Sequence, residues 1–536
     1  MADNIPPSAG LLDTHPAKER DVLPSVSTTV ALRKSTAPCS QQAQAAHGRG
    51  TLDPERRAAR QARIMAEITV MVREAFEGLP LFGDGALDLD GIELAVQAAL
   101  RPVGGRLVEG AFLERVLDCE AIPPRCPNCR RRMEREQRKR KLEGLVGPSV
   151  LERGHYRCRN CHVNVIPADQ EMGVGPGALS PALSRVVAMN VAQDPFGQAA
   201  RMVNEALHTA LTQAEVYRTG EALGAVAAAD EAAQLAIPPT ADGGAAETAT
   251  VPPADTPAPP VPPGAPTTLL IGADGTTTHT DGDWHEVKVG VVAPLGPETK
   301  LHPQTGHQVL VSGSKDYCAV VGTADEFFPR LKVLVRQAGW DHPHLQTLLK
   351  VADGGRWIWT RMEQFDRPGV ESVEVLDYIH ASGHIWDLAG HLFGQGTLDA
   401  YIWAEPLALG LKEQGPAALL AALAAARPRS AAAKATLHTE REYFQTHAAA
   451  GRLDYPRFTA HGWPIASGTV EAACKSVVCQ RTKGSGMRWR TRGAQAVLSL
   501  RCLFLSPDRW AAFFRTHPGL RRPPVATLRK TMTHAA

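Results

Sequence analysis

Two Asp-Gly pairs follow short apolar runs in the second half of the chain. Asp274 closes the run LLIGAD, and Asp353 closes LLKVAD. A strand holds an aspartate at its end in a fixed position, and the glycine lets the chain turn away. On neighbouring strands, two such carboxylates would bind divalent ions, and paired ions about 4 Å apart clamp the oxygens exchanged at phosphorus. Asp-Gly is also a common turn, so a metal site requires a third carboxylate.

Glu471 is the candidate for that third carboxylate. It lies in SGTVEAACKSVVCQRTKGSGMRW, where Ser467 or Thr469 can cap a helix and place Glu471 in its first turn. A glutamate there also suits the helix dipole, which is the simpler explanation. The basic, glycine-broken stretch that follows favours a site holding metal ions and a DNA backbone together. Its basic residues are Lys475, Arg481, Lys483, Arg488, Arg490 and Arg492.

Three other residues near these segments have competing interpretations. Asp281 and Asp283 compete with Asp274 for the place of the first carboxylate, although no apolar strand precedes them. Trp489, in the sequence GMRW, either stacks on an unpaired DNA base or anchors its loop in the core.

A separate metal site is predicted from two C-x-x-C pairs. Four thiolates arranged in this way are typical of a zinc ribbon with a structural Zn²⁺ ion. The four are Cys126, Cys129, Cys158 and Cys161. His155 and His162 are alternative ligands. The basic run between the pairs is either a solvated face or, as its place in a ribbon favours, a contact with the DNA backbone. The candidate DNA contacts are Arg130, Arg131, Arg132, Arg138, Lys139 and Arg140.

The composition limits the class of protein. With 536 residues and 44% hydrophobic residues, the chain is expected to form two to four globular domains. Its net charge of +2 means that local basic patches must carry any contact with nucleic acid. Ten cysteines with one clustered set suit a reducing compartment. Neither a secretory signal nor an 18-residue apolar span is present, which predicts a cytoplasmic protein without membrane contact. The Ala, Arg and Gly usage is typical of a GC-rich bacterium, in which a DNA-binding protein would be nucleoid-associated.

The elements that must position these residues follow from composition and periodicity. The expected segments are a disordered tail (1–50), a helical region (51–118), a zinc ribbon (119–170), a helical region that is either a helix-turn-helix or a plain bundle (175–236), a Pro-rich linker (237–267), a catalytic domain (268–505) and a C-terminal tail (506–536). Inside the catalytic domain, the expected strands are Leu269–Ala273, Trp284–Val292, Tyr317–Gly322, Thr347–Ala352 and Val373–Ile379.

The helices of the catalytic domain complete a recognisable order. One is expected over Phe327–Ala338, a helical insertion over about 384–455, and a last helix from Thr469 to about Arg481. Three strands, a helix, further strands and a late helix is the order of an α/β ribonuclease-H-like fold.

Four segments resemble the insertion-sequence DDE transposases of the Kra type, distant relatives of the Mutator-like group. They are ADGTTTHTDGDWHEVKVGVV, KVADGGRWIW, VEVLDYIH and SGTVEAACKSVVCQRTKGSGMRWRTRGAQAVLSLR, and the last is the most specific. The resemblance covers 269–505. It implies that Asp274, Asp353 and Glu471 are catalytic and hold two Mg²⁺ or Mn²⁺ ions.

The resemblance also bears on Asp377 and His380, which form a D-x-x-H pattern. Mutator-like transposases have a C/D-x-x-H feature between the second Asp and the Glu. His380 therefore either lies near the site as a catalytic residue, or is a strand-end histidine held by packing.

The implied function is DNA transposition. The protein would bind double-stranded DNA at the terminal inverted repeats of its own element, cleave the ends and join the 3′-OH to target DNA, as a homodimer or larger assembly. Two rival interpretations are a ribonuclease-H-like, structure-specific nuclease without strand transfer, and a zinc-ribbon DNA-binding protein with a decayed catalytic core.

Overall fold

A computed structural model describes residues 54–79, 87–120, 122–235 and 267–517. They belong to one compact unit of the chain, Thr51–Ala536. The expected disordered tail and nearly all of the expected Pro-rich linker lie outside the described residues. No described helix is long and apolar enough to cross a membrane.

Two long helices open the described chain. α1 (Pro54–Glu77) and α2 (Leu89–Cys119) pack through a small apolar cluster in which Ile64 and Ile68 meet Val103. The Asp88 side chain caps α2 by accepting a hydrogen bond from the Gly91 N–H at 2.9 Å. These helices occupy the region where helical spacing predicted them.

A small antiparallel sheet follows, with the order β1-β2-β3. Its strands are β1 (Glu134–Leu142), β2 (Ser149–Arg157) and β3 (Asn164–Val165). The second half of the basic run, Arg138–Lys141, lies on β1, whose residues are mostly exposed, whereas alternate residues of β2 are buried.

Four helices come next, and the last two helices of the chain join their core. They are α3 (Pro167–Glu171), α4 (Pro181–Gln193), α5 (Phe196–Leu207) and α6 (Gln213–Leu235). Leu183 and Val187 of α4 share a buried cluster with Trp510 and Phe513 of α17 (Pro507–Thr516). The expectation of a tail from residue 506 is therefore wrong for residues 507–516, because the helix starting at Pro507 buries two aromatic rings.

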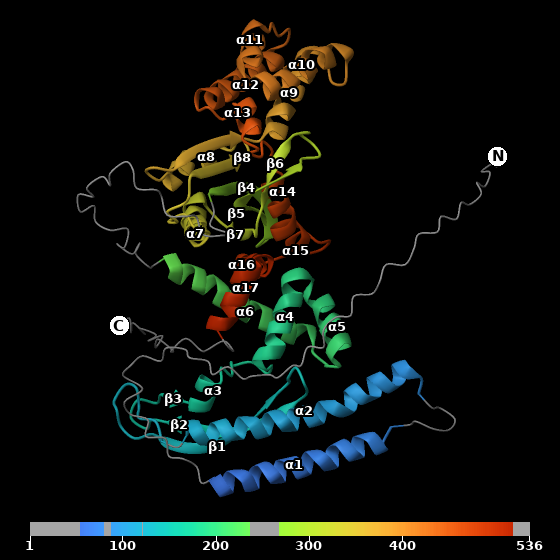
Figure 1. Cartoon of the computed structure of the whole chain (residues 1–536), viewed down its shortest axis with the longest axis vertical. Coiled ribbons are helices and arrows are strands. Elements are labelled where there is room, and N and C mark those ends of the chain that lie inside the picture. Colours follow the sequence, from blue (N-terminus) through green and yellow to red (C-terminus); the bar gives the residue numbers. More distant parts are fainter. Residues whose placement is uncertain (1–53, 80–86, 121, 236–266, 518–536) are drawn as a thin grey trace, which may run out of the picture. The chain divides into compact units, whose positions relative to one another are not determined.

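The central element is a six-stranded mixed sheet with the order β6-β5-β4-β8-β9 and with β7 also paired to β5 (Figure 1). β4 runs antiparallel to β5 and parallel to β8, and β8 runs parallel to β9. The strands are β4 (Thr268–Thr280), β5 (Asp283–Leu301), β6 (Gln308–Ser312), β7 (Asp316–Val321), β8 (Thr347–Ala352) and β9 (Glu371–Leu376). A mixed α/β architecture is thus confirmed.

Three details of this sheet differ from the expectation. β4 does not stop at Ala273 but continues along β5 to Thr280. β6 was not predicted, and β9 ends at Leu376, so His380 lies on a helix rather than on a strand.

The two faces of the sheet are covered by different helices. One buried cluster joins Leu269 and Ile271 of β4 to α7 (Ala324–Gln337) and α8 (Arg356–Met362). A second joins Val289 and Val291 of β5 to α14 (Gly468–Ala473), a π-helical segment (Cys474–Cys479) and α16 (Thr491–Leu505). The alternation of side chains along each strand produces these two layers.

Helices fill the chain between β9 and α14. They are α9 (Tyr378–Phe393), α10 (Leu398–Gln414), α11 (Ala417–Ala425), α12 (Ala431–Ala449) and α13 (Tyr455–Ala460). The predicted last helix is present as α14, the π-helical segment and α15 (Gln480–Thr482) in direct succession.

Candidate active site and zinc centre

Asp274 and Asp353 each come directly after one of two residues that are paired between parallel strands. Ala273 of β4 is the register partner of Ala352 of β8. The next residue of each strand therefore lies at the same edge of the sheet, with backbones on the order of 5 Å apart. β8 ends here, whereas β4 continues beside β5.

A third aspartate, Asp377, stands at the same edge and was not predicted there. Ala352 is the register partner of Leu376, so Asp377 follows β9 as Asp353 follows β8. Its side chain is buried, accepts hydrogen bonds from the Ile379 and His380 N–H groups, and binds the Ser467 hydroxyl. Asp377 thereby caps α9 and ties it to the start of α14. The apolar run VEVL before Asp377 is the sequence feature that could have predicted an aspartate at this strand end.

Glu471 is carried by a helix that packs on β4. A Cβ atom added to Gly272 would lie 2.3 Å from Val470 Cγ2, so α14 approaches the strand as closely as a glycine permits. The Glu471 side chain is exposed and pairs with Lys475 at 2.6 Å. Within the described part of the chain, the Asp274, Asp353 and Glu471 carboxylates are not gathered into one group of close ligand atoms.

The environment of Asp274 disfavours its charge. Burial raises the pKa of this carboxyl, and the charge of Asp353 raises it further. Three groups oppose the shift: the Cys474 thiol, which donates to Oδ2 at 3.2 Å, the Gly275 N–H, and the nearby His380. Two carboxylates in mutual repulsion at a partly buried edge suit a divalent cation.

Asp281 and Asp283 do not reach this edge. They lie at the tip of the β4–β5 hairpin, and Asp281 is seven residues beyond Asp274, about 20 Å along an extended strand. The Asp281 carboxylate accepts hydrogen bonds from the Thr491 N–H and hydroxyl, at the start of α16. Their alternative assignment as the first carboxylate is therefore not supported.

Exposed basic residues lie beside Asp274 and beside the tip of the β4–β5 hairpin. Lys483 donates to the Thr276 hydroxyl at 2.8 Å, two residues beyond Asp274 on β4. Lys475, Arg488, Arg490 and Arg492 are also exposed. These side chains remain candidates for DNA contact.

Arg481 does not belong among these candidate DNA contacts, although the sequence predicted it there. It is only 1% exposed, and its Nε donates to the Val191 carbonyl at 2.7 Å, at the C-terminal end of α4. Arg501 donates to the neighbouring Ala192 carbonyl at 2.5 Å. A cation suits the free carbonyls at a helix end, so Arg481 joins two helices rather than facing DNA.

Trp489 belongs to the same contact. Its ring lies 5.0 Å from the Arg481 guanidinium and 6.0 Å from the Phe196 ring, and its indole N–H donates to the Thr482 carbonyl. The partly buried ring therefore anchors its loop, which favours the second of its two interpretations.

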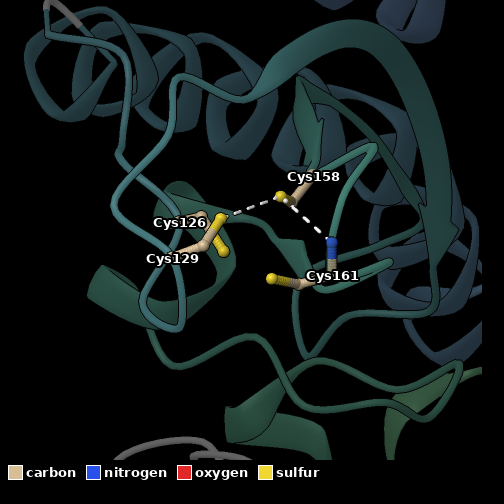
Figure 2. A group of neighbouring side chains, drawn as sticks. All are labelled: Cys126, Cys129, Cys158 and Cys161. Carbon is tan, nitrogen blue, oxygen red and sulfur yellow. Dashed lines mark hydrogen bonds between the residues drawn. The ribbon is translucent and has the colours of Figure 1, made fainter.

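The four cysteines of the C-x-x-C pairs come together (Figure 2). Their Sγ atoms all lie within 4.8 Å of one another, and the Cys129 and Cys158 sulfurs are 3.6 Å apart. Sulfurs that share one tetrahedral zinc at about 2.3 Å must be roughly 3.8 Å apart, which the arrangement matches. These cysteines can hold a structural zinc ion, without His155 or His162.

The two knuckles have the same backbone geometry. The Arg130 N–H donates to the Cys126 carbonyl, and the His162 N–H donates to the Cys158 carbonyl, each at 2.9 Å. Arg130 and His162 both have positive φ, 60° and 54°. A hydrogen bond from the Arg131 backbone lowers the pKa of Cys129, while its thiol neighbours, Cys129 first, raise the pKa of Cys161. A bound zinc ion would hold all four as thiolates.

The basic side chains of the ribbon are mostly exposed. Arg130, Arg131 and Arg132 are exposed, as are Arg138 and Lys139, which pair with Glu136 and Glu152 on the strand surface. Arg140 differs, because it is half-buried and donates to the carbonyls of Gly175 and Gly177. Arg140 therefore binds the loop at Gly175–Gly177, and the prediction that it contacts DNA is not supported.

The sequence matches neither any protein-family model nor any curated protein.

Proposed function

We propose that this protein is a DNA transposase of the DDE type, and that Asp274 and Asp353 form the centre of its active site. The observation that carries the proposal is the shared register of Ala273 and Ala352, from which both aspartates lie at the same edge of the sheet. The strand order, with three antiparallel strands followed by two parallel ones on the other side of β4, supports a ribonuclease-H-like interpretation of the fold.

The donor set fits magnesium or manganese. Asp274 and Asp353 offer carboxylate oxygens, the ligands that these hard ions take. Two such ions, when bound, would supply charge stabilisation for an in-line displacement at phosphorus. Asp274 is held by Cys474 and Gly275, so its orientation is set before any ion or DNA arrives.

Glu471 would complete the ligand set by a side-chain movement. It lies in the first turn of α14, which contacts β4, and its partner is the flexible Lys475. An exposed ion pair of this kind contributes at most about 1 kcal/mol, so exchange of Lys475 for a metal ion costs little. Lys475 would then be free to bind a DNA phosphate.

DNA would be held by the exposed basic residues of two regions. Lys483 contacts Thr276 of β4, Arg488 lies next to Trp489 beside the tip of the β4–β5 hairpin, and Arg131 and Arg138 lie on the zinc ribbon. Their contacts would be to phosphates and would carry little sequence information. Synapsis of two transposon ends would require at least a homodimer on DNA.

The experiment incubates the purified protein and Mg²⁺ or Mn²⁺ with DNA that carries the inverted repeats flanking its own gene. Cleavage at the repeat ends, followed by joining of the 3′-OH to target DNA, is expected. Cleavage without joining would assign the protein to structure-specific nucleases instead. Repeat-specific binding without cleavage would indicate a decayed catalytic core.

A further inference from the structure

A second group of metal-ligating side chains lies at the start of α9. His380 and His384 are one helical turn apart, and their Nε2 atoms are 3.2 Å apart. Two imidazole nitrogens that share one ion at about 2.1 Å lie about 3.0 Å apart for a right angle at the metal and about 3.4 Å for a tetrahedral angle. The observed spacing lies inside that interval.

Glu440 fixes the outer nitrogen of His384. Both carboxylate oxygens of Glu440 lie near His384 Nδ1, at 3.1 Å and 3.0 Å, and Glu440 is only 8% exposed. An ionised carboxylate can only accept a hydrogen bond, so Nδ1 carries the proton and Nε2 of the neutral ring has a free lone pair. This is the carboxylate–histidine pairing found behind metal-bound histidines.

Tyr443 restricts the orientation of the His384 ring by stacking on it. The two rings are stacked, with centroids 4.3 Å apart and an interplanar angle of 23°. On its other side, Tyr443 presses on the turn after Asp353, since a Cβ added to Gly354 would lie 2.3 Å from Tyr443 Cε2. Because the His384 ring is stacked on Tyr443 and hydrogen-bonded to Glu440, it loses little entropy when it binds an ion.

The pair also opens toward solvent. His380 is exposed, and it is close enough to Asp274 to lower the pKa of that carboxyl. Two protein ligands would leave the other coordination positions to water or to a phosphate oxygen.

We propose that His380 and His384 form a chelating site for one transition-metal ion of the Zn²⁺, Co²⁺ or Ni²⁺ class, with Glu440 orienting His384. Imidazole nitrogens suit these ions, whereas carboxylates and water suit Mg²⁺. Its proposed ligands are other residues than Asp274 and Asp353, and the inference goes beyond the transposase proposal without depending on it.

The test is a Co²⁺ titration of the full chain in millimolar Mg²⁺, measured by calorimetry and visible absorption. The protein carries one Zn²⁺ ion per chain in its ribbon, and excess Zn²⁺ is removed beforehand because free Zn²⁺ would fill the histidine site. The wild-type protein is expected to bind one Co²⁺ ion more than His380→Gln or His384→Gln. Glu440→Gln should weaken this binding by about 10–100-fold. Two variants should bind as the wild type does: His391→Gln, an exposed histidine on the same helix, and Asp353→Asn.

Equal Co²⁺ binding by the wild type and both histidine variants would overturn the proposal. Loss of the ion in Asp353→Asn with retention in the histidine variants would also overturn it, because the ion would then belong to the carboxylates. Circular dichroism and ribbon zinc content confirm that each variant folds. The exposed His380→Gln decides the outcome if His384→Gln does not fold.

Discussion

The side chains of the candidate site are held by partners of very different strength. Asp274 has a buried thiol and a backbone N–H as hydrogen-bond donors, whereas Glu471 has one exposed lysine. A buried hydrogen-bonded group is fixed, and an exposed ion pair exchanges easily. At the scale of residues, Asp274 is therefore preorganised and Glu471 is the mobile member of the predicted set.

Substitution of Arg481 should lower the stability of the protein, whereas substitution of Arg488 should weaken DNA binding. Arg481→Gln removes a buried charged hydrogen bond to α4 and is expected to lower the free energy of unfolding by about 2 kcal/mol or more. Arg488→Gln should change it by less than about 0.5 kcal/mol and instead weaken DNA binding, with a salt dependence shallower by about one charge. Urea unfolding and DNA titrations at several salt concentrations measure both. A wild-type unfolding midpoint for Arg481→Gln would contradict the assignment.

His447 should make stability depend on pH. Burial, and next the charge of Arg452, lower the pKa of His447 to about 4, against about 6.5 in an unfolded chain. Between these values the unfolded chain binds the extra proton. The stabilising contribution is therefore fully present above pH 6.5, and at most about 3 kcal/mol is lost as the pH falls toward 4.

The variant His447→Gln should reduce this pH dependence, measured as the difference in urea midpoint between pH 7 and pH 4.5. His438→Gln, an exposed position on the same helix α12, is the matched control and should keep the wild-type slope. The same slope in both variants would show that His447 is not the group responsible.

At the scale of elements, the site depends on how closely α14 approaches β4. Gly272→Ala would place a methyl group against Val470 and push α14 off the strand. A loss of about 1–3 kcal/mol in the free energy of unfolding is expected, together with weaker catalysis because Glu471 moves with the helix. Gly410→Ala, on the open side of α10, should be neutral or stabilising. Thermal unfolding of both variants measures the contrast.

Much of the sheet was predictable, because a strand that ends in Asp-Gly has a simple local signature. Thr347–Ala352 was predicted with the bounds observed for β8. The continuation of β4 to Thr280 was not, because the residues from Asp274 to Thr280 are polar or glycine and lack the apolar pattern that predicts a strand. The burial of Arg481 was not predictable either, since a basic run does not reveal which arginine meets a helix end.

At the scale of the whole molecule, contacts between distant segments connect the helices before residue 236 to the mixed sheet. Arg481 and Arg501 bind the end of α4, and a Cβ added to Gly224 of α6 would lie 2.2 Å from the Ala496 carbonyl oxygen of α16. The sequence around residues 237–267 predicted a boundary between two domains. The observed packing instead makes α4–α6 and the last helices parts of one core.

Loss of zinc should affect the ribbon and leave the mixed sheet folded. Cys158→Ser removes one of the four thiolates, and the ribbon has only a few buried side chains besides its cysteines. Elemental analysis is expected to show less zinc, and proteolysis should cut within residues 122–166 while residues 267–517 stay protected. Cys318→Ser, a buried cysteine on β7, is the control that should retain zinc. Full zinc content in Cys158→Ser would refute the ribbon.

The role of Asp353 as a ligand of the catalytic metal ions is tested most directly by the metal dependence of end cleavage. Asp353→Cys is compared with the wild type and with Asp283→Asn. A thiolate is a poorer ligand for Mg²⁺ than for softer ions. Asp353→Cys is expected to be inactive in Mg²⁺ and to regain part of its cleavage in Mn²⁺, while Asp283→Asn should cleave as the wild type does in both. Wild-type cleavage by Asp353→Cys in Mg²⁺ would contradict the assignment of this carboxylate to the catalytic metal site.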